Sequence, residues 1–362
     1  MKLYQMHPTE PDICDILRRI IEEQLTPLID SDYIYLDLPY YSNTGDALIW
    51  MGTEHFLKDI PHKCLGRHNI DTFDFRPLPS DTVLLLNGGG NFGDIWRQHQ
   101  DFRLRVIQQY TENPIIVLPQ TVFYESEDIL TADVQEMNRH HHLTICVRDT
   151  HSVELLKQKG FSGRLLTLPD MAFCIDREWL LTNKIGISKD TLLLLRKDKE
   201  SPLGNIREDI TSADLDIKDW PNLNKSLRTA LRYIRKHTAT ETDNYFQTNY
   251  LPERIKEGVE FVSAYKTVFS TRLHVVILRL LLGLPVKIIN NSYGKNLDFY
   301  DTWLKDAALV SILSEEEKKT LSRHVDFYQQ QSRKRRCRRI LLGVLFPVLV
   351  LVAVLLFYYI TH

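Results

Sequence analysis

Three polar side chains lie between two apolar segments and could bind an anion and transfer a proton: Thr271, Arg272 and His274. The apolar run 267–270 precedes them, and the almost wholly apolar run 273–282 follows. Because burying an unpaired charge costs several kcal/mol, Arg272 needs a partner, which is either a carboxylate of the protein or an anionic ligand. An imidazole titrates near neutral pH, so His274 is either a general acid or a half-buried side chain with a structural hydrogen bond.

Two neighbouring apolar runs also end in polar or basic residues. The run 191–195 ends at Arg196, and the run 285–289 ends at Asn290, with Lys295 a few residues later. Both runs have the length and composition of strands. Ligands of open parallel sheets bind at the carboxyl ends of the strands, so we expect these side chains beside the arginine and histidine described above.

A strand, a glycine-containing loop and the start of a helix follow each other early in the chain. The segment 33–37 alternates like a strand, the loop contains Asn43, Gly45 and Asp46, and a helical pattern follows over 47–57. The start of a helix binds anions through its free N–H groups. Since aspartate is strongly preferred as a helix cap, Asp46 is either the N-cap or a general base.

Three consecutive glycines follow the predicted strand 82–86: Gly88, Gly89 and Gly90. They allow a ligand or another backbone to approach closely, although a plain tight turn also uses glycines. The pattern is not GxGxxG, so it does not predict a nicotinamide dinucleotide site. Other polar residues after strand ends in this part of the chain are Asp94, Gln120 and Arg148.

The composition is that of a folded globular protein, with 43% hydrophobic and 25% charged residues in a chain of 362. The net charge of -2 gives no basic face for nucleic acid. The five cysteines have no zinc-site spacing and indicate reduced thiols in a cytosolic setting. The run 140–142 of three histidines is interpreted as solvated surface, because adjacent residues on a helix cannot converge on one metal ion.

Strand and helix patterns alternate along most of the chain. This order predicts an α/β fold with parallel sheets covered by helices on both faces. Because single cores rarely exceed roughly 250 to 300 residues, we expect two Rossmann-like domains, at 1–185 and 186–332, with a cleft between them.

The C-terminal segment 333–362 has a different composition. A basic cluster at 333–339 precedes 340–360, a run of 21 residues without a charge. About 20 apolar residues suffice to span a bilayer as a helix. The sequence therefore predicts a single-pass protein of the inner (cytoplasmic) membrane, with its catalytic domains in the cytoplasm, on the side of the basic cluster.

Several short motifs between residues 33 and 301 together resemble the polysaccharide pyruvyl transferase family. They are Asn43-Thr44-Gly45-Asp46, Gly88-Gly89-Gly90, Pro119-Gln120, Val147-Arg148-Asp149 with Ser152, Asp170-Met171-Ala172-Phe173, Ser270-Thr271-Arg272-Leu273-His274, and Gly283 with Pro285-Val286. The sequence departs from the commonest family pattern at Thr121, where a glycine is usual. The resemblance implies two Rossmann-like domains similar to the GT-B glycosyltransferases.

The resemblance also implies a reaction, in which the pyruvate unit of phosphoenolpyruvate is transferred to two hydroxyls of a sugar as a cyclic ketal. The family's Arg-x-His signature falls on Arg272 and His274, and its basic strand tip falls on Arg196. We expect the two arginines to hold the phosphate and carboxylate of the donor, because guanidinium groups suit both. His274 is then the general acid, and Asp46 the general base, with Asp94 as its substitute.

The remaining expected substrate-binding residues are Asn43, Gly88, Gly89, Gly90, Gln120, Arg148, Asn290 and Lys295. This scheme requires neither a metal nor a nucleotide cofactor. A membrane anchor would favour an acceptor sugar carried on a lipid, because tethering raises the local enzyme concentration. The expected setting is the synthesis of a capsule or exopolysaccharide.

Two other functions remain open on the sequence. A GT-B glycosyltransferase using a nucleotide sugar would share the architecture, but it needs a carboxylate to hold a ribose, and the sequence shows no clear candidate near Arg272. A non-catalytic, membrane-bound polysaccharide assembly protein would keep the site without using it.

Overall fold

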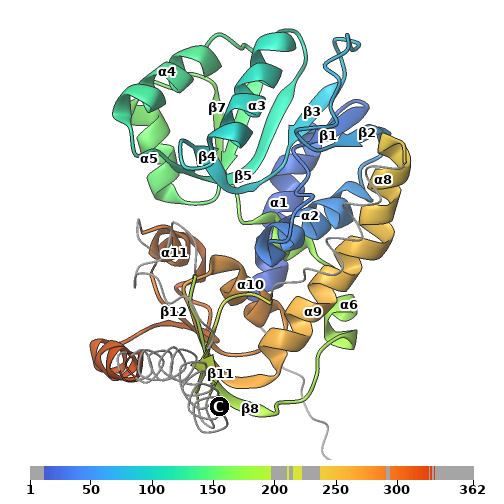
Figure 1. The fold of residues 1–362 in the computed structure, drawn as a ribbon. Coiled ribbons are helices and arrows are strands. Elements are labelled where there is room, and N and C mark those ends of the chain that lie inside the picture. Colours follow the sequence, from blue (N-terminus) through green and yellow to red (C-terminus); the bar gives the residue numbers. More distant parts are fainter. Residues whose placement is uncertain are drawn as a thin grey trace, which may run out of the picture.

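The structure is a computed structural model that describes residues 12–196, 210–211, 215–221, 237–290, 294–325, 327 and 330. Its described strands form two sheets, one from each half of the chain (Figure 1). We refer to the part that carries the first sheet as the N-terminal half, and to the part that carries the second as the C-terminal half.

The first sheet has the strand order β2-β1-β3-β5-β6-β7, with β4 paired to β5, and its neighbouring strands are parallel. The strands are β1 (Tyr33–Leu36), β2 (Cys64–His68), β3 (Val83–Leu86), β4 (Gly89–Gly93), β5 (Ile115–Phe123), β6 (Leu143–Val147) and β7 (Arg164–Thr167). Every residue of β1 and β3 is buried, as expected for parallel strands covered on both faces.

The second sheet has the order β13-β12-β11-β8-β10-β9. Its neighbouring strands are parallel, except that β9 runs antiparallel to β10. The strands are β8 (Lys189–Leu194), β9 (Ile210–Thr211), β10 (Leu215–Lys218), β11 (Tyr265–Ser270), β12 (Val286–Ile288) and β13 (Val310–Ile312).

Helices cover the sheets and fill the space between them (Figure 1). Those of the N-terminal half are α1 (Ile13–Leu25), α2 (Thr44–Leu57), α3 (Arg97–Gln109), α4 (Glu127–Met137), α5 (Thr150–Gln158) and α6 (Arg177–Thr182), with the short helices η1 (Thr26–Leu28) and η2 (Met171–Cys174). Those of the C-terminal half are α8 (Ala239–Tyr245), α9 (Leu251–Ser263), α10 (Leu273–Leu281) and α11 (Lys295–Phe299), with the π-helical segments η3 (Phe246–Tyr250) and η4 (Tyr300–Leu304).

A single hydrophobic core joins the two sheets. It contains Leu85 of β3 and Leu194 of β8, with Trp50 of α2 and Val276 of α10 in the same cluster. Helix α2 contacts both α9 and α10 of the C-terminal half. The two halves are therefore packed against each other through this core.

The predicted α/β fold with parallel sheets is confirmed by these two sheets, which are consistent with Rossmann-like halves. The strands of the first sheet come from 33–167, and those of the second from 189–312. The division at residues 185 and 186 stays a prediction, because the core is shared across it.

The transmembrane part of the predicted fold has to be corrected. Among the described residues, no helix has both the length and the apolar character needed to cross a membrane. This finding overturns the predicted single-pass location in the inner membrane. The basic cluster and the apolar run 340–360 themselves lie outside the described residues.

The predicted solvated surface run 140–142 is wrong at His140. This side chain is buried, and its Nε2 lies 2.9 Å from the carbonyl oxygen of Tyr110. His141 and His142 are exposed, in a turn rather than a helix.

Candidate active site

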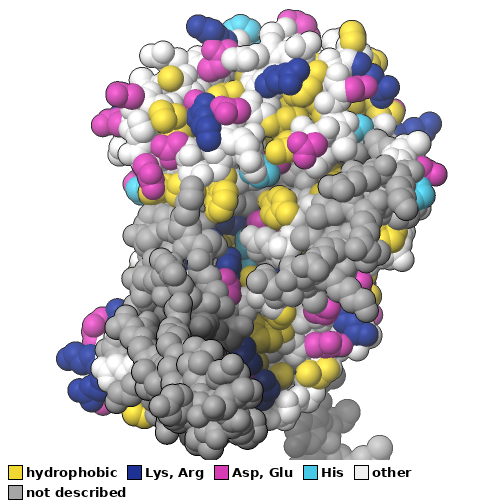
Figure 2. Space-filling model, in the orientation of Figure 1, with side chains coloured by type: hydrophobic (Ala, Val, Ile, Leu, Met, Phe, Trp, Pro, Cys, Tyr) yellow, Lys and Arg dark blue, Asp and Glu magenta, His cyan; other side chains and the backbone are white. Residues whose placement is uncertain are grey.

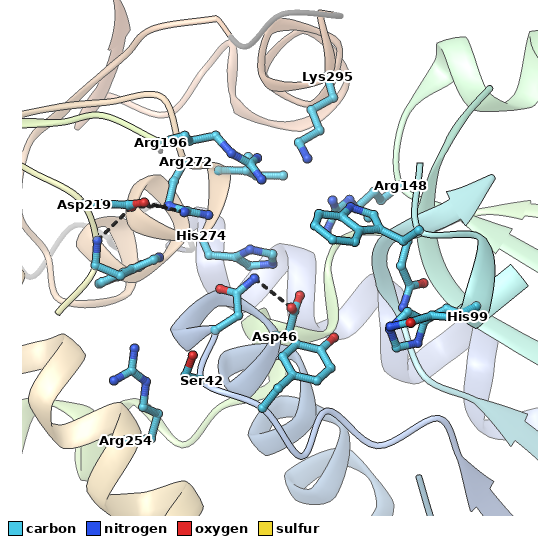
Figure 3. Close-up of a pocket in the computed structure, with 18 residues that line it drawn as sticks. Ser42, Asp46, His99, Arg148, Arg196, Asp219, Arg254, Arg272, His274 and Lys295 are labelled. Atoms are coloured by element: carbon cyan, nitrogen blue, oxygen red, sulfur yellow. Dashed lines mark hydrogen bonds and ion pairs between the residues drawn. The ribbon is translucent and has the colours of Figure 1, made fainter. Parts of the chain in front are cut away.

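A cleft of about 440 Å³ lies between the two halves, where the carboxyl ends of strands from both sheets meet (Figure 3). In Figure 2 basic and histidine side chains are visible in a hollow between the upper and lower lobes. The predicted site residues that line the cleft are Asn43, Asp46, Gly90, Arg148, Arg196, Arg272, His274 and Lys295. The strand-end argument thus brings together residues separated by up to about 250 positions in the sequence.

Two cations from opposite halves flank Gly90. Arg148 follows β6, and Lys295 is the first residue of α11. A Cβ atom at Gly90 would lie 3.3 Å from Nη2 of Arg148 and 3.4 Å from Nζ of Lys295. The missing side chain therefore keeps open the space in front of both cations, which suits an anionic group.

His274 is paired with Asp170, a residue not predicted to take part in the site. Its Nε2 lies 3.2 Å from Oδ2 of Asp170, which also accepts a hydrogen bond of 2.5 Å from Nη1 of Arg148. Burial raises the pKa of Asp170, but the charge and hydrogen bond of His274 and the charge of Arg148 outweigh burial and hold this pKa well below its usual value. A carboxylate that stays ionised fixes the orientation of the imidazole.

The start of α2 packs against this histidine. Asn43 is the N-cap, because its Oδ1 accepts from the N–H of Gly45 at 2.9 Å, and its Nδ2 donates to Asp46 at 2.7 Å. The capping alternative for Asp46 is therefore wrong, and its carboxylate lines the cleft instead. A Cβ atom at Gly45 would lie only 2.6 Å from Nδ1 of His274, so glycine is required for this close approach.

Arg272 forms a bidentate ion pair with Asp219, at 2.5 Å and 2.7 Å. The salt-bridge alternative is therefore the arrangement present in the structure. Asp219 follows β10 and is a second residue that the sequence did not single out, since a carboxylate partner of Arg272 was an alternative but no candidate for it was clear. A carboxylate of the kind that a glycosyltransferase would need is therefore present in the cleft, where both of its oxygens accept from the guanidinium of Arg272. Arg196 is buried beside this pair, and its backbone N–H donates to Oγ1 of Thr271 at 3.0 Å.

A second histidine and aspartate pair lies on the N-terminal side, where His99 lines the cleft and Asp37 is buried behind it. Nδ1 of His99 lies 2.7 Å from Oδ1 of Asp37, which has a left-handed backbone with φ of 63°. Burial acts to lower the pKa of His99, but the hydrogen bond and charge of Asp37 outweigh it and raise this pKa. Asp37 ends the first predicted strand, which was the one sequence signal that could have pointed to it.

Two π-helical segments of the C-terminal half fix the backbone of the cleft. The hydroxyl of Tyr250 donates to the carbonyl of Tyr41 at 3.0 Å, and Nε1 of Trp303 donates to the carbonyl of Arg148 at 2.8 Å. Both acceptor residues line the cleft. Departures from regular helix of this kind occur frequently at functional sites.

The other predicted site residues do not line the cleft. Gly88 faces the carbonyl of Pro119, where a Cβ would lie 2.8 Å away, and Gly89 has a φ of 134° at the start of β4. Nε2 of Gln120 is bonded to buried groups of the N-terminal half, and Asn290 is partly exposed.

Asp94 is not positioned to act as a base. Its carboxylate accepts from the N–H groups of Glu125 at 2.8 Å and Ser126 at 2.8 Å, so it anchors the loop before α4. The prediction of Asp94 as a substitute for Asp46 is therefore corrected.

The charged side chains that line the cleft are mostly cationic. The basic ones are Arg148, Arg196, Arg254, Arg272 and Lys295, and the acidic ones are Asp46 and Asp219. A low-dielectric cleft lined mainly by one sign of charge concentrates ligands of the opposite sign. The site is therefore suited to an anionic substrate, with an imidazole and a carboxylate available for proton transfer.

Comparison with known proteins places these features in context. Residues 43–293 match the family model described as polysaccharide pyruvyl transferase. The chain is 28% identical over 313 residues to the Bacillus subtilis (strain 168) protein named "Putative pyruvyl transferase EpsO", covering 83% of this chain and 95% of that protein. It is 25% identical to "Pyruvyl transferase 1" of Schizosaccharomyces pombe (strain 972 / ATCC 24843), covering 79% of this chain and 74% of that protein.

A solved structure has a similar fold. It is a functionally uncharacterized protein from Klebsiella pneumoniae subsp. pneumoniae NTUH-K2044, with a TM-score of 0.58 and 20% identity, covering 82% of this chain and 98% of that one. At this level of identity the likeness concerns the fold alone.

Proposed function

Because the chain belongs to the polysaccharide pyruvyl transferase family, we propose that it transfers the pyruvate unit of phosphoenolpyruvate to two hydroxyls of a sugar, as a cyclic ketal. The observation that carries this proposal is the meeting of cations from both halves at Gly90, next to the paired His274. Phosphoenolpyruvate has a phosphate and a carboxylate, so it requires more than one cation.

The donor would lie between the two groups of cations in the cleft. Arg148 and Lys295 face the space in front of Gly90 and would hold one anionic group. Arg196 and Arg272 follow β8 and β11 on the C-terminal side and would hold the other. Asp219 would then act as the counter-ion of Arg272 before the donor binds, which keeps that guanidinium in a binding orientation.

In the first step, one sugar hydroxyl adds to C2 of the donor. His274 gives a proton to the methylene carbon C3, and Asp46 takes the proton of the attacking hydroxyl, so a C–O bond and a C–H bond replace the double bond. In the second step, the second hydroxyl attacks C2 and gives its proton to the neutral imidazole of His274. The C–O bond to phosphate breaks, and phosphate leaves with the proton that Asp46 took in the first step. Each transfer suits a group held within hydrogen-bonding reach.

The acceptor would enter from the side of the N-terminal half. Aromatic and polar side chains that line the cleft there include Tyr41, Asn91, Trp96 and His99. Such a mixture suits a sugar ring, which has apolar faces and a polar edge. We assign this sugar to a capsule or exopolysaccharide under synthesis. Its attachment to a lipid was predicted from the membrane segment, so both free and lipid-linked forms require testing.

The test is mass spectrometry of candidate acceptor sugars incubated with the protein, with and without phosphoenolpyruvate. We expect a product whose mass exceeds that of the acceptor by one pyruvate less one water, and phosphate release only when both substrates are present. Product formation that requires a nucleotide sugar instead would contradict the proposal and favour a glycosyltransferase.

A further inference from the structure

One arginine of the cleft has no place in the donor site described above. Arg254 lies on α9 and is only 2% exposed. Figure 3 shows it on the side of the cleft that holds Ser42, well apart from Lys295 and Arg148. Its position separates it from the cations that face Gly90.

The guanidinium of Arg254 is incompletely bonded. Nη2 donates to the carbonyl oxygen of Pro221 at 3.0 Å, whereas the buried Nε and Nη1 make no hydrogen bond with the described residues. The carboxylate oxygen Oε2 of Glu257 is 4.0 Å from Nη1, too far for a hydrogen bond, and it also lacks a hydrogen-bond donor. Burial raises the pKa of Glu257, which weakens it as a counter-ion.

The indole of Trp220 also has a buried N–H, that of Nε1, without a hydrogen-bond acceptor among the described residues. The residue lines the same cleft. A buried donor left without an acceptor destabilises the unliganded protein, and more so when the donor is charged. A ligand that supplied acceptor oxygens to both residues would recover this cost on binding.

These donors lie where α9 approaches the start of α2. A Cβ atom at Gly258, one turn beyond Arg254, would lie 2.7 Å from the side chain of Thr44 and 3.7 Å from the ring of Trp220. Thr44 is the first residue of α2, and its buried hydroxyl also lacks a hydrogen bond. The positive end of the helix dipole adds to the local attraction for an anion.

We infer that Arg254 and Trp220 form a second anion subsite, which binds a phosphate ester or a carboxylate of the acceptor. The inference rests on the proposed function, in which Asp46 near the start of α2 deprotonates the acceptor. The two anionic groups of the donor are already matched by the cations around Gly90 and by Arg196 with Arg272. An anion near Ser42 and Arg254 therefore belongs to the molecule whose hydroxyl faces Asp46. The acceptor is a charged sugar rather than a neutral one.

The test measures binding directly by isothermal titration calorimetry, with glucose, glucose 1-phosphate and glucuronate as probes. We expect the full chain to bind at least one charged probe about 10- to 100-fold more tightly than glucose, as for hydrogen bonds to charged groups. The probe that gains affinity identifies the group as phosphate or carboxylate. Equal affinity for all three probes would overturn the inference.

Variants distinguish binding of the acceptor's anionic group from a donor-site role and from a structural role. Arg254→Met and Trp220→Phe should abolish the preference for the charged probe and leave the affinity for phosphoenolpyruvate unchanged. Lys256→Met is the matched control, since it removes a half-exposed cation from the same helix. Because Arg254→Met removes two buried donors that lack acceptors among the described residues, it should not lower the Tm.

Two results would contradict the subsite. One is a weaker affinity of Arg254→Met for phosphoenolpyruvate, which would place the arginine in the donor site. The other is a lower Tm with no change in probe binding, which would make its role structural. Absence of any ketal product from the unmodified protein would instead refute the proposed function, while the probe titrations would still report on the subsite.

Discussion

Nε2 of His274 lies 3.2 Å from Oδ2 of Asp170, and the two residues come from opposite halves of the chain. Asp170 follows β7 at the end of the N-terminal half, whereas His274 is the second residue of α10. The proposed acid is therefore oriented only when the two halves are packed together. This dependence leads to predictions that distinguish catalysis from folding.

Substitution of His274 by Ala should lower kcat by roughly 100-fold or more, the scale of general acid catalysis. The fold should persist, because the side chain is 13% exposed and makes one hydrogen bond among the described residues. Steady-state assays of phosphate release measure the effect. His151→Ala, at an exposed position of α5, is the control and should retain full activity. Unchanged sugar pyruvylation with His274→Ala would indicate a non-catalytic role.

Substitution of Asp170 by Asn should destabilise the protein in a pH-dependent manner. The pKa of this carboxyl is held well below its usual value of about 3.9, so the ionised form contributes stability that is present above that pH and is lost as the pH falls toward the folded-state pKa. Loss of the charge also leaves Arg148 buried without its anion, at a cost of about 3–5 kcal/mol. Urea unfolding between pH 7 and pH 3 measures both effects. A stability difference that is constant over this range would contradict the prediction.

Substitution of Gly45 by Ala should lower activity without unfolding the protein. The new methyl group would lie 2.6 Å from Nδ1 of His274 and would displace the imidazole. Alanine is favoured over glycine in a helix by about 1 kcal/mol, which opposes the cost of displacing the imidazole, so the free energy of unfolding should change little. Gly186→Ala is the matched control, because no atom lies within 4 Å of its Cβ position. Equal kcat in both variants would show that the close approach is not needed.

Substitution of Lys295 by Met should raise the KM for phosphoenolpyruvate about 10- to 100-fold, because a charged hydrogen bond to the donor is lost. The kcat should change less, since this residue has no proposed part in proton transfer. Initial-rate kinetics at varied donor concentration separate the two parameters. Lys305→Met is the control, because its side chain is 62% exposed. A fall in kcat with unchanged KM would place Lys295 outside the donor site.

Substitution of Asp243 by Asn should flatten the pH dependence of stability between about pH 4 and pH 6. Burial raises the pKa of Asp243 to about 6, and its carboxylate accepts a hydrogen bond from the hydroxyl of Tyr40 at 2.9 Å. Because the folded-state pKa is raised, its stabilising contribution is complete below the unfolded value of about 3.9 and is lost as the pH rises through about 6. The loss is about 3 kcal/mol at pH 7. Thermal unfolding of the unmodified protein and of Asp243→Asn between about pH 4 and pH 7 tests this prediction. Parallel plots of Tm against pH for the two proteins would contradict it.

The parallel sheets and much of the cleft could be predicted from the sequence because both follow from local patterns. Alternating strands and helices require parallel strands, and parallel strands bring their carboxyl ends to one edge. That rule brought Arg196, Arg272 and Lys295 to one end of the second sheet and Arg148 to one end of the first, and the expected cleft between the two domains brought the four together.

Partners such as Asp170, Asp219 and Asp37 could not be assigned in the same way. Asp219 and Arg272 are 53 residues apart in the sequence. They follow β10 and β11, which are both neighbours of β8 in the sheet, so their side chains meet at the same end of it. Such pairs depend on the order of the strands in the sheet and on the direction of each side chain. The spacing of residues along the sequence predicts neither. Asp94 shows the opposite error, since an acidic residue after a strand end can equally anchor a loop.

The shared core between the sheets limits how this enzyme can be re-engineered. Exchanging the N-terminal half for that of a relative, in order to alter sugar selectivity, would set a foreign α2 against native α9 and α10. Chimeras joined near residue 185 would therefore inherit mismatched packing around Trp50, unless the facing positions of the recipient were transplanted with it.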